Sequence, residues 1–132
     1  MSKLFKKLNL KDQNAILALN SPESFLSELN ELENIRIYSN LQKVKSVAFV
    51  IAFIKSADEI QRLAEPIAEK APGDAVIWFA YPKKTSKKFN VSINRDQGWD
   101  ALEKAGFKAV RQVAIDQDWS AIRFRRKNLV GK

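Results

Sequence analysis

The amino-acid sequence predicts a three-layer α/β sandwich whose mostly parallel sheet has about six strands. Two runs, Val47–Ile54 and Ala75–Tyr81, are apolar throughout and lack the alternation of a half-exposed strand. Strands buried on both faces have this pattern, and they belong to parallel sheets that helices cover on each side. Segments with helical spacing lie between the strand-like runs, and the last two runs suggest an antiparallel hairpin.

The first part of the chain predicts a strand, a helix and a second strand. Residues 14–20 form a short apolar run that ends at Ser21-Pro22-Glu23. Serine is a preferred helix cap, proline suits the first helical position and glutamate the first turn, so a helix is expected to begin there. Its apolar stripe continues to about Glu33, and Ile35–Tyr38 is expected to form a short strand.

The link between this second strand and the apolar run at Val47 is short. Parallel crossovers usually need a dozen or more residues, whereas Ser39–Ser46 supplies fewer. Two alternatives remain open. Either this segment runs extended across one face of the sheet, or the second and third strands form a hairpin.

The next unit is expected to be a helix that begins with a capping box at Ser56-Ala57-Asp58-Glu59. Within it, Pro66 removes the amide bond to the carbonyl of Arg62, which predicts a kink or a break. Pro72-Gly73-Asp74 then predicts a turn before the apolar run that begins at Ala75.

The C-terminal part predicts a loop, a helix and a hairpin. A lysine-rich loop at 82–90 precedes a helix at roughly 95–105, and Gly106-Phe107 suits a left-handed helix stop. The strands Val110–Asp116 and Trp119–Arg126 are separated by two residues, as in an antiparallel hairpin with a tight turn.

We expect residues 1–132 to form a single domain, since no repeat or internal linker divides the chain. Residues 1–10 are expected to be a basic N-terminal segment, and residues 128–132 a flexible basic tail. The longest apolar run has eight residues, whereas a membrane-spanning helix needs about 20. Lys6 and Lys7 interrupt the N-terminal segment, unlike the core of a secretion signal. These features predict a cytoplasmic protein with no membrane partner.

The composition excludes several kinds of chemistry. The chain has no Cys and no His, so disulfides, thiolate nucleophiles, Cys or His metal sites and Ser-His-Asp catalysis are ruled out. We expect no metal and no cofactor.

The formal net charge is +8, and residues 75–132 hold thirteen basic and five acidic side chains. Two clusters dominate this part: Lys83, Lys84, Lys87 and Lys88, then Arg123, Arg125, Arg126 and Lys127. This basic half suits either a polyanion-binding surface or a solvated surface that keeps the protein in solution.

Three segments carry a resemblance to a known family: Asn20-Ser21-Pro22-Glu23, the run from Trp78 to Lys84, and the run from Val113 to Arg123. On these segments the chain resembles, from about residue 10 to 127, small bacterial proteins known only as a conserved domain of unknown function. The resemblance implies no activity. The order of elements is also similar to the trimmed core of a class I methyltransferase, which has a Rossmann-like sheet ending in a reversed hairpin.

The turn after the first predicted strand differs from the corresponding turn of a class I methyltransferase. Nucleotide and adenosylmethionine sites usually need a glycine-rich turn there, so that the backbone can approach the ligand. Residues 19–24 contain no glycine, Pro22 lacks an amide donor, and Glu23 adds negative charge where a phosphate would lie. We therefore do not expect an intact methyltransferase.

Ligands of open parallel sheets bind outside the carboxyl ends of the strands, near helix N-termini. This rim is expected to collect six residues from three loops: Asn20, Ser21, Lys55, Ser56, Lys83 and Lys84. If the fifth strand is parallel to the others, Asp116 and Trp119 join them. Each has a structural alternative: the serines would cap helices, Asp116 would shape a turn or pair with a rim lysine, and Trp119 would pack in the core.

Three functions are compatible with this pattern. The leading hypothesis is a non-enzymatic, Rossmann-like module that binds an anionic partner (nucleic acid, nucleotide or other phosphate-bearing ligand) through the lysine-rich carboxyl edge. A second is a degenerate or minimal methyltransferase-like enzyme acting on a small phosphorylated metabolite. A third is a protein-interaction domain for an acidic partner. The third would bind its partner through the basic tail, residues 123–132, whereas a pocket at the rim requires Lys55, Lys83 and Asp116 to lie on one side of the molecule.

Overall fold

The structure is a computed structural model that describes residues 2–84, 86, 93 and 98–130. Its strands are β1 (Ala15–Leu19), β2 (Arg36–Tyr38), β3 (Phe49–Phe53), β4 (Val76–Pro82), β5 (Phe107–Ala114) and β6 (Trp119–Arg126). Its helices are α1 (Lys3–Lys7), α2 (Glu23–Asn30), α3 (Ala57–Lys70) and α4 (Asp100–Lys104), with single 3-10 turns at Leu41–Lys43 and Lys127–Leu129.

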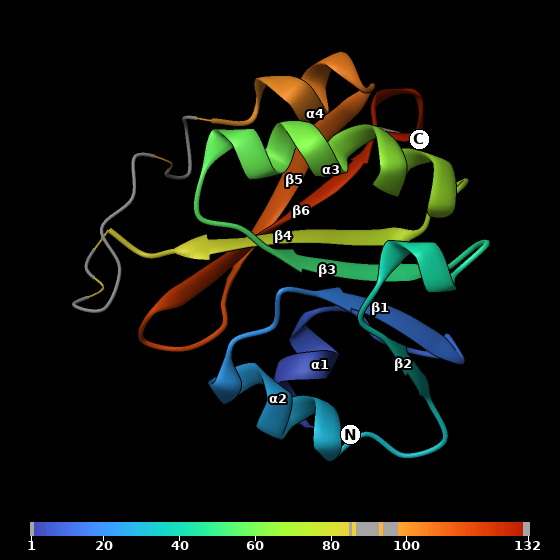
Figure 1. The fold of residues 1–132 in the computed structure, drawn as a ribbon, viewed down its shortest axis with the longest axis vertical. Helices are drawn as coiled ribbons and strands as arrows, with labels where there is room; N and C mark the ends of the chain where they lie inside the picture. Colours follow the sequence, from blue (N-terminus) through green and yellow to red (C-terminus); the bar gives the residue numbers. More distant parts are fainter. Residues whose placement is uncertain (1, 85, 87–92, 94–97, 131–132) are drawn as a thin grey trace.

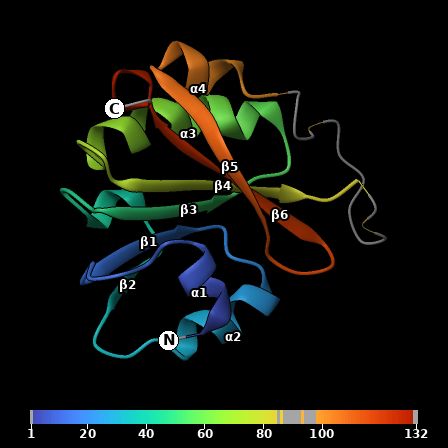
Figure 2. The ribbon, with the colours of Figure 1, turned by 180° about the vertical axis from the view of Figure 1, so that it is seen from behind.

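The strands form one mixed sheet in the order β2-β1-β3-β4-β6-β5. The first four are parallel, while β6 is antiparallel to both β4 and β5. Helices α3 and α4 cover one face and α1 and α2 the other, which gives three layers (Figures 1 and 2). The predicted fold class, a Rossmann-like sandwich with a C-terminal antiparallel hairpin, is confirmed.

The two unbroken apolar runs form the centre of this sheet. Every residue of β3 and of β4 is buried. Alternate residues serve two cores: Val50, Ile77 and Phe79 pack on the α3 side, whereas Ile51, Phe53 and Trp78 pack on the α1 side. A polar residue on either face would lose its hydration, which explains why these runs contain none.

The short link between β2 and β3 is a crossover and not a hairpin. Both strands pair in parallel with β1, one on each side of it. The connecting segment crosses β1 on the α3 side, where Val44 is buried and Leu41 packs against the core. Lys70 in the last turn of α3 donates to the carbonyl of Val44 (2.6 Å). The segment between β2 and β3 therefore runs across one face of the sheet, as the first alternative predicted, and core contacts hold it there.

Two helices differ from their predicted limits. Helix α2 begins at Glu23 with Pro22 as its N-cap, so Ser21 does not cap it. Helix α3 continues through Pro66 without a break. Burial of Ile60, Ala64 and Ile67 along its inner face offsets the one hydrogen bond that the proline removes.

The C-terminal elements also shift. Helix α4 begins only at Asp100, and most of its expected first part lies outside the described residues. Gly106 adopts the predicted left-handed conformation (φ 95°), and Phe107 after it is buried. Strand β5 begins at Phe107, three residues before the prediction, and the hairpin loop spans 115–118 instead of two residues.

The basic N-terminal segment contributes to the core. Helix α1 buries Phe5, and Leu8 and Leu10 after it are buried as well. The indole of Trp78 donates to the carbonyl of Leu8 (2.8 Å) across 70 positions of sequence. A helix of five residues is too short to show a periodic pattern, which is why the sequence did not predict it.

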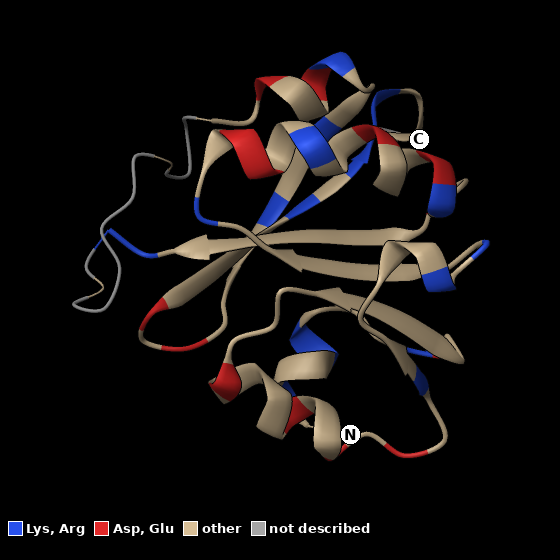
Figure 3. Ribbon diagram, viewed as in Figure 1, with Lys and Arg blue, Asp and Glu red and all other residues tan. Residues whose placement is uncertain are grey.

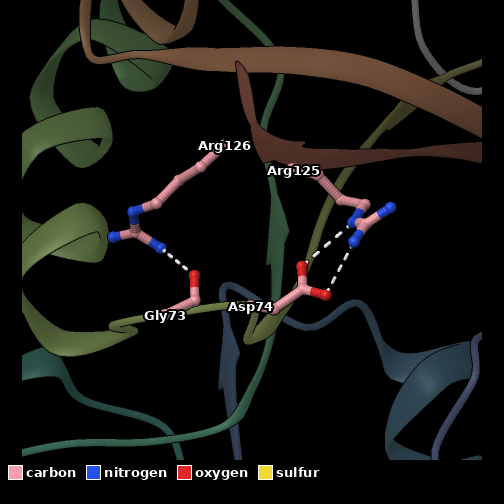
Figure 4. Close-up of polar contacts among 4 residues, drawn as sticks. All are labelled: Gly73, Asp74, Arg125 and Arg126. Atoms are coloured by element: carbon pink, nitrogen blue, oxygen red, sulfur yellow. Dashed lines mark hydrogen bonds and ion pairs between the residues drawn. The ribbon is translucent and has the colours of Figure 1, made fainter. Parts of the chain in front are cut away.

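The end of β6 is tied to the end of α3 by one arginine. Arg126 donates to the carbonyls of Ala68 (2.8 Å), Ala71 (3.0 Å) and Gly73 (2.6 Å), and Figure 4 shows the last of these contacts. Its guanidinium also lies 5.0 Å from the ring centroid of Phe107. A cation in this position satisfies unpaired carbonyls and complements the negative end of the helix dipole.

We predict that Phe5→Ala lowers the free energy of unfolding by about 3–5 kcal/mol, as other buried Phe→Ala changes do. Phe5 is fully buried, with its ring centroid 5.5 Å from that of Phe25. Urea denaturation measures the change. Leu26→Ala, at a site 46% exposed, is the control and should change stability by less than about 0.5 kcal/mol. Equal effects of the two substitutions would show that α1 does not contribute to the fold.

We predict that Arg126→Met lowers the free energy of unfolding by about 1–3 kcal/mol, because the carbonyls lose a charged donor while the apolar stem is kept. Thermal and urea denaturation measure it. Lys45→Met, at an exposed position, is the matched control and should be close to neutral. A neutral Arg126→Met would contradict the role of Arg126 as the cap of α3.

Candidate functional site

The carboxyl ends of β1, β3 and β4 meet at one edge of the sheet because these strands are parallel. Strand β6 starts at the same edge, since Trp119 pairs with Pro82 at the end of β4. The amide of Lys83 donates to the carbonyl of Asp118 (2.8 Å). We call the loop residues 20–22, 54–56, 83, 84, 86 and 115–118 the carboxyl rim. Lys55, Lys83 and Asp116 all belong to it.

The turn after β1 bends without glycine. Asn20 itself takes the left-handed conformation (φ 56°), which asparagine tolerates better than most residues. Its side-chain amide donates to the carbonyl of Phe53 at the end of β3 (3.3 Å). Asn20 therefore bridges two strand ends across the space through which a ligand would reach the backbone.

Ser21 follows this bend with its hydroxyl oxygen buried and without a hydrogen-bond partner. Pro22 at the N-cap of α2 contributes no amide donor and no side-chain cap. The start of α2 is therefore poorly suited to hold a phosphate in the manner of a glycine-rich turn.

The start of α3 is capped as predicted, with one difference. The hydroxyl of Ser56 accepts from the amide of Glu59 (3.2 Å). In return, the Glu59 carboxylate accepts from the amide of Lys55 (2.9 Å), one residue before the cap. Capping is thus the structural role of Ser56, and Glu59 brings a negative charge to this part of the rim.

Asp116 shapes the hairpin loop. One oxygen of its carboxylate accepts from the amides of Asp118 (2.8 Å) and Trp119 (2.9 Å), and the other accepts from the Ser24 hydroxyl (3.2 Å). Among the described residues Asp116 makes no ion pair with Lys83 or Lys84. Turn formation, which was one of the alternatives, is the role that the structure supports.

Trp119 packs in the core. It is 3% exposed, and its ring meets that of Phe53 edge-on at 5.1 Å between centroids. Its indole is therefore not available to stack on a base or sugar. The remaining charged groups of the predicted rim are Lys55 and Lys84, which are exposed, and Lys83, which is half-buried. Lys87 and Lys88 lie outside the described residues.

A small cavity of about 220 Å³ lies beside the rim and is lined by Asn20, Glu59, Arg62 and Leu63. Ligand pockets usually measure about 300–1,000 Å³, so this cavity suits a fragment of a ligand at most. Glu59 and Arg62 were not among the predicted site residues. Their spacing of three residues near the start of a helix places them on one face, and this spacing could have indicated a shared site.

The arginine cluster lies at the opposite end of the sheet, because β6 runs from the rim toward Asp74. Figure 3 shows basic positions along β5 and β6. Arg126 caps α3, and the Lys127 amine donates to the carbonyl of Glu103 (3.2 Å). The six-residue basic patch stays a prediction, since Lys87 and Lys88 lie outside the described residues. Of its other members, Arg126 and Lys127 bind backbone carbonyls, while Arg123 and Arg125 belong to the other face of the sheet.

In the described part of the chain, no helix has both the length and the apolar character needed to cross a membrane. No protein-family model matches the chain, and no curated protein matches it in sequence.

Several of the solved structures similar to the chain are named as methyltransferases. The N-methyltransferase NodS from Bradyrhizobium japonicum WM9 has a TM-score of 0.59 at 10% identity, with 94% of this chain and 92% of that protein covered. A SAM-dependent methyltransferase from Aquifex aeolicus has a TM-score of 0.60 at 14% identity, covering 92% and 87%. The Methanococcus jannaschii fibrillarin pre-rRNA processing protein has a TM-score of 0.57 at 14% identity, covering 89% and 68%. At such identities the likeness establishes the fold alone: the chain has a methyltransferase-like Rossmann core.

Proposed function

We propose that this protein is a non-enzymatic binding module that takes a phosphate-bearing ligand at the carboxyl rim of a methyltransferase-like fold. The observation that carries the proposal is the gathering of Lys55, Lys83 and Lys84 on the edge where open α/β sheets bind ligands. Ammonium groups attract phosphate oxygens, and the nearby N-terminus of α3 adds positive potential.

Adenosylmethionine, implied by the SAM-dependent neighbour, does not fit this rim. The side chain of Asn20 bridges to Phe53 where the ligand would approach the backbone, and Pro22 lacks an amide to offer. Glu59 and the small volume of the adjacent cavity count against enclosing the adenosine of this ligand beside α3, whereas a ligand held by its phosphates alone needs no such enclosure. These features count against methyl transfer from a bound adenosylmethionine.

A second candidate is a minimal methyltransferase-like enzyme that acts on a small phosphorylated metabolite. The solved structures with a similar fold include methyltransferases, so the fold supports this enzyme better than it supports a binding module. Fold and chemistry are separable, however, because one scaffold hosts many functions. The predicted resemblance to small bacterial proteins of unknown function, which no family model supports, favours neither candidate.

Thermal-shift measurements with inorganic triphosphate, ADP and S-adenosylhomocysteine test the proposal. A ligand that binds only the native state at about 100 times its Kd stabilises the protein by about 2.7 kcal/mol, which raises Tm by several degrees. We predict such a rise with triphosphate and ADP at low salt, and its loss in the double variant Lys83→Gln/Lys84→Gln.

The matched control, Lys43→Gln/Lys45→Gln, removes the same charge from exposed positions in the β2–β3 connection and should keep the shift. The absence of any shift with triphosphate or ADP would refute the binding proposal. A rise with S-adenosylhomocysteine, together with methyl transfer from labelled adenosylmethionine, would establish the enzyme instead.

A further inference from the structure

The hairpin of β5 and β6 places cations directly opposite one another. Lys108 pairs with Arg125, and Arg111 pairs with Arg123, across a β-bulge between Ala109 and Arg111. Paired residues of an antiparallel ladder project on the same face of the sheet. Arg123 also pairs with Trp78, which is in the α1-side core, so all four cations lie on that face. We call these four residues the hairpin cluster.

Such an arrangement is unfavourable for folding. Like charges directly opposite in a sheet are destabilising. Among the described residues, Asp74 is the one carboxylate paired with the cluster, through two hydrogen bonds from Arg125 of 3.0 and 2.8 Å (Figure 4). One negative charge thus faces four positive ones.

Arg123 shows the consequence most clearly. Its Nε atom is buried and has no hydrogen-bond partner. Burial lowers the pKa of its guanidinium, and Asp74 opposes this shift. The neighbouring charges of Arg125 and Arg111 lower the same pKa further. Arginine nevertheless stays protonated in proteins, so the partly buried guanidinium of Arg123 keeps its positive charge. This burial costs free energy, and a bound anion would offset that cost.

The face that holds the cluster is covered only in part. Near the rim, Val113, Trp119 and Ala121 are buried in the α1-side core, whereas the ends of β5 and β6 at Phe107 and Arg126 extend away from α1 and α2 (Figure 2). Lys108 and Arg111 are exposed, and Arg123 and Arg125 are half-exposed. A large partner therefore has access to all four side chains.

We propose that this face of the hairpin binds the phosphate backbone of a nucleic acid. Three of the four cations are arginines, whose planar guanidinium groups match phosphate geometry. On β6, Arg123 and Arg125 are two residues apart, which in a strand spaces them by about 6.6 Å. That repeat is close to the spacing of successive phosphates in an extended single strand.

The surroundings of the cluster indicate contacts with phosphates and not with bases. The aromatic side chain on this face next to Arg123 is Trp78, which is fully buried and cannot stack on a base. Four cations with one paired carboxylate among the described residues also suit a polyanion better than the mixed charges of a typical protein surface. The surface is therefore sequence-independent, and it lies apart from the carboxyl rim, so it does not depend on the proposed function.

Fluorescence anisotropy with a labelled single-stranded RNA of mixed sequence tests this proposal on the full-length protein. We expect binding at about 50 mM salt that weakens steeply toward about 200 mM. The double variant Lys108→Gln/Arg111→Gln, at exposed positions, should weaken binding at least about tenfold and reduce the log–log salt slope by about 1.4, the share of two phosphate contacts on a single strand.

Two further variants make the test specific. Asp74→Asn removes the one paired carboxylate and should tighten RNA binding, which is the opposite of what damage to the fold would do. Lys43→Gln/Lys45→Gln removes the same charge from exposed positions of the β2–β3 connection, outside the hairpin and the rim, and should change the RNA affinity by less than about threefold.

Three results would overturn the proposal. The first is no binding of RNA at low salt. The second is an equal loss of affinity in Lys108→Gln/Arg111→Gln and in Lys43→Gln/Lys45→Gln, which would show attraction by net charge alone. The third is tighter binding of polyglutamate than of RNA at equal charge, which would assign the surface to an acidic protein partner. Circular dichroism of each variant confirms that it remains folded.

Discussion

The antiparallel pairing of β6 with β4 is the constraint on which the rest of the arrangement depends. Strand β4 is buried along its whole length, so its second neighbour must present apolar side chains to both cores. Strand β6 does so with Ala121 on one face and Ile122 and Phe124 on the other. Because β6 runs against β4, its first residues lie at the carboxyl rim and its last residues lie at the opposite end, where Arg126 reaches the end of α3.

This reversal divides the positive charge of the C-terminal half between two places. The lysines that follow β4 remain at the rim, whereas the arginines of β6 are carried away from it along the strand. At the rim, Asn20 joins the ends of β1 and β3, Ser56 caps α3 and Asp116 shapes the hairpin loop, while the lysines add positive charge. The turn after β1 contains no glycine: Asn20 supplies the left-handed bend, and its side-chain amide bonds to the end of β3.

Much of the fold could be predicted from patterns that burial imposes. Val47–Ile54 and Ala75–Tyr81 lack polar residues because both faces are covered, and Gly106 ends α4 in the expected conformation. Helix α1 could not be predicted, since five residues show no period, and the crossover after β2 depends on contacts from α3. At the rim, residue type alone could not distinguish a ligand-binding residue from a structural one. Asp116 and Trp119 both lie there, yet Asp116 bonds to amides of its own loop and Trp119 packs against Phe53. The hairpin cluster depends on strand register, which the sequence does not specify.

Amide chemical-shift mapping of the isotope-labelled protein distinguishes two separate binding surfaces from a single one. We expect inorganic triphosphate to shift the amide resonances of Lys55, Lys83 and their neighbours, and single-stranded RNA to shift those of Lys108, Arg111 and Arg123. A single shared set of shifted amides for both ligands, or RNA shifts confined to the rim, would contradict this expectation.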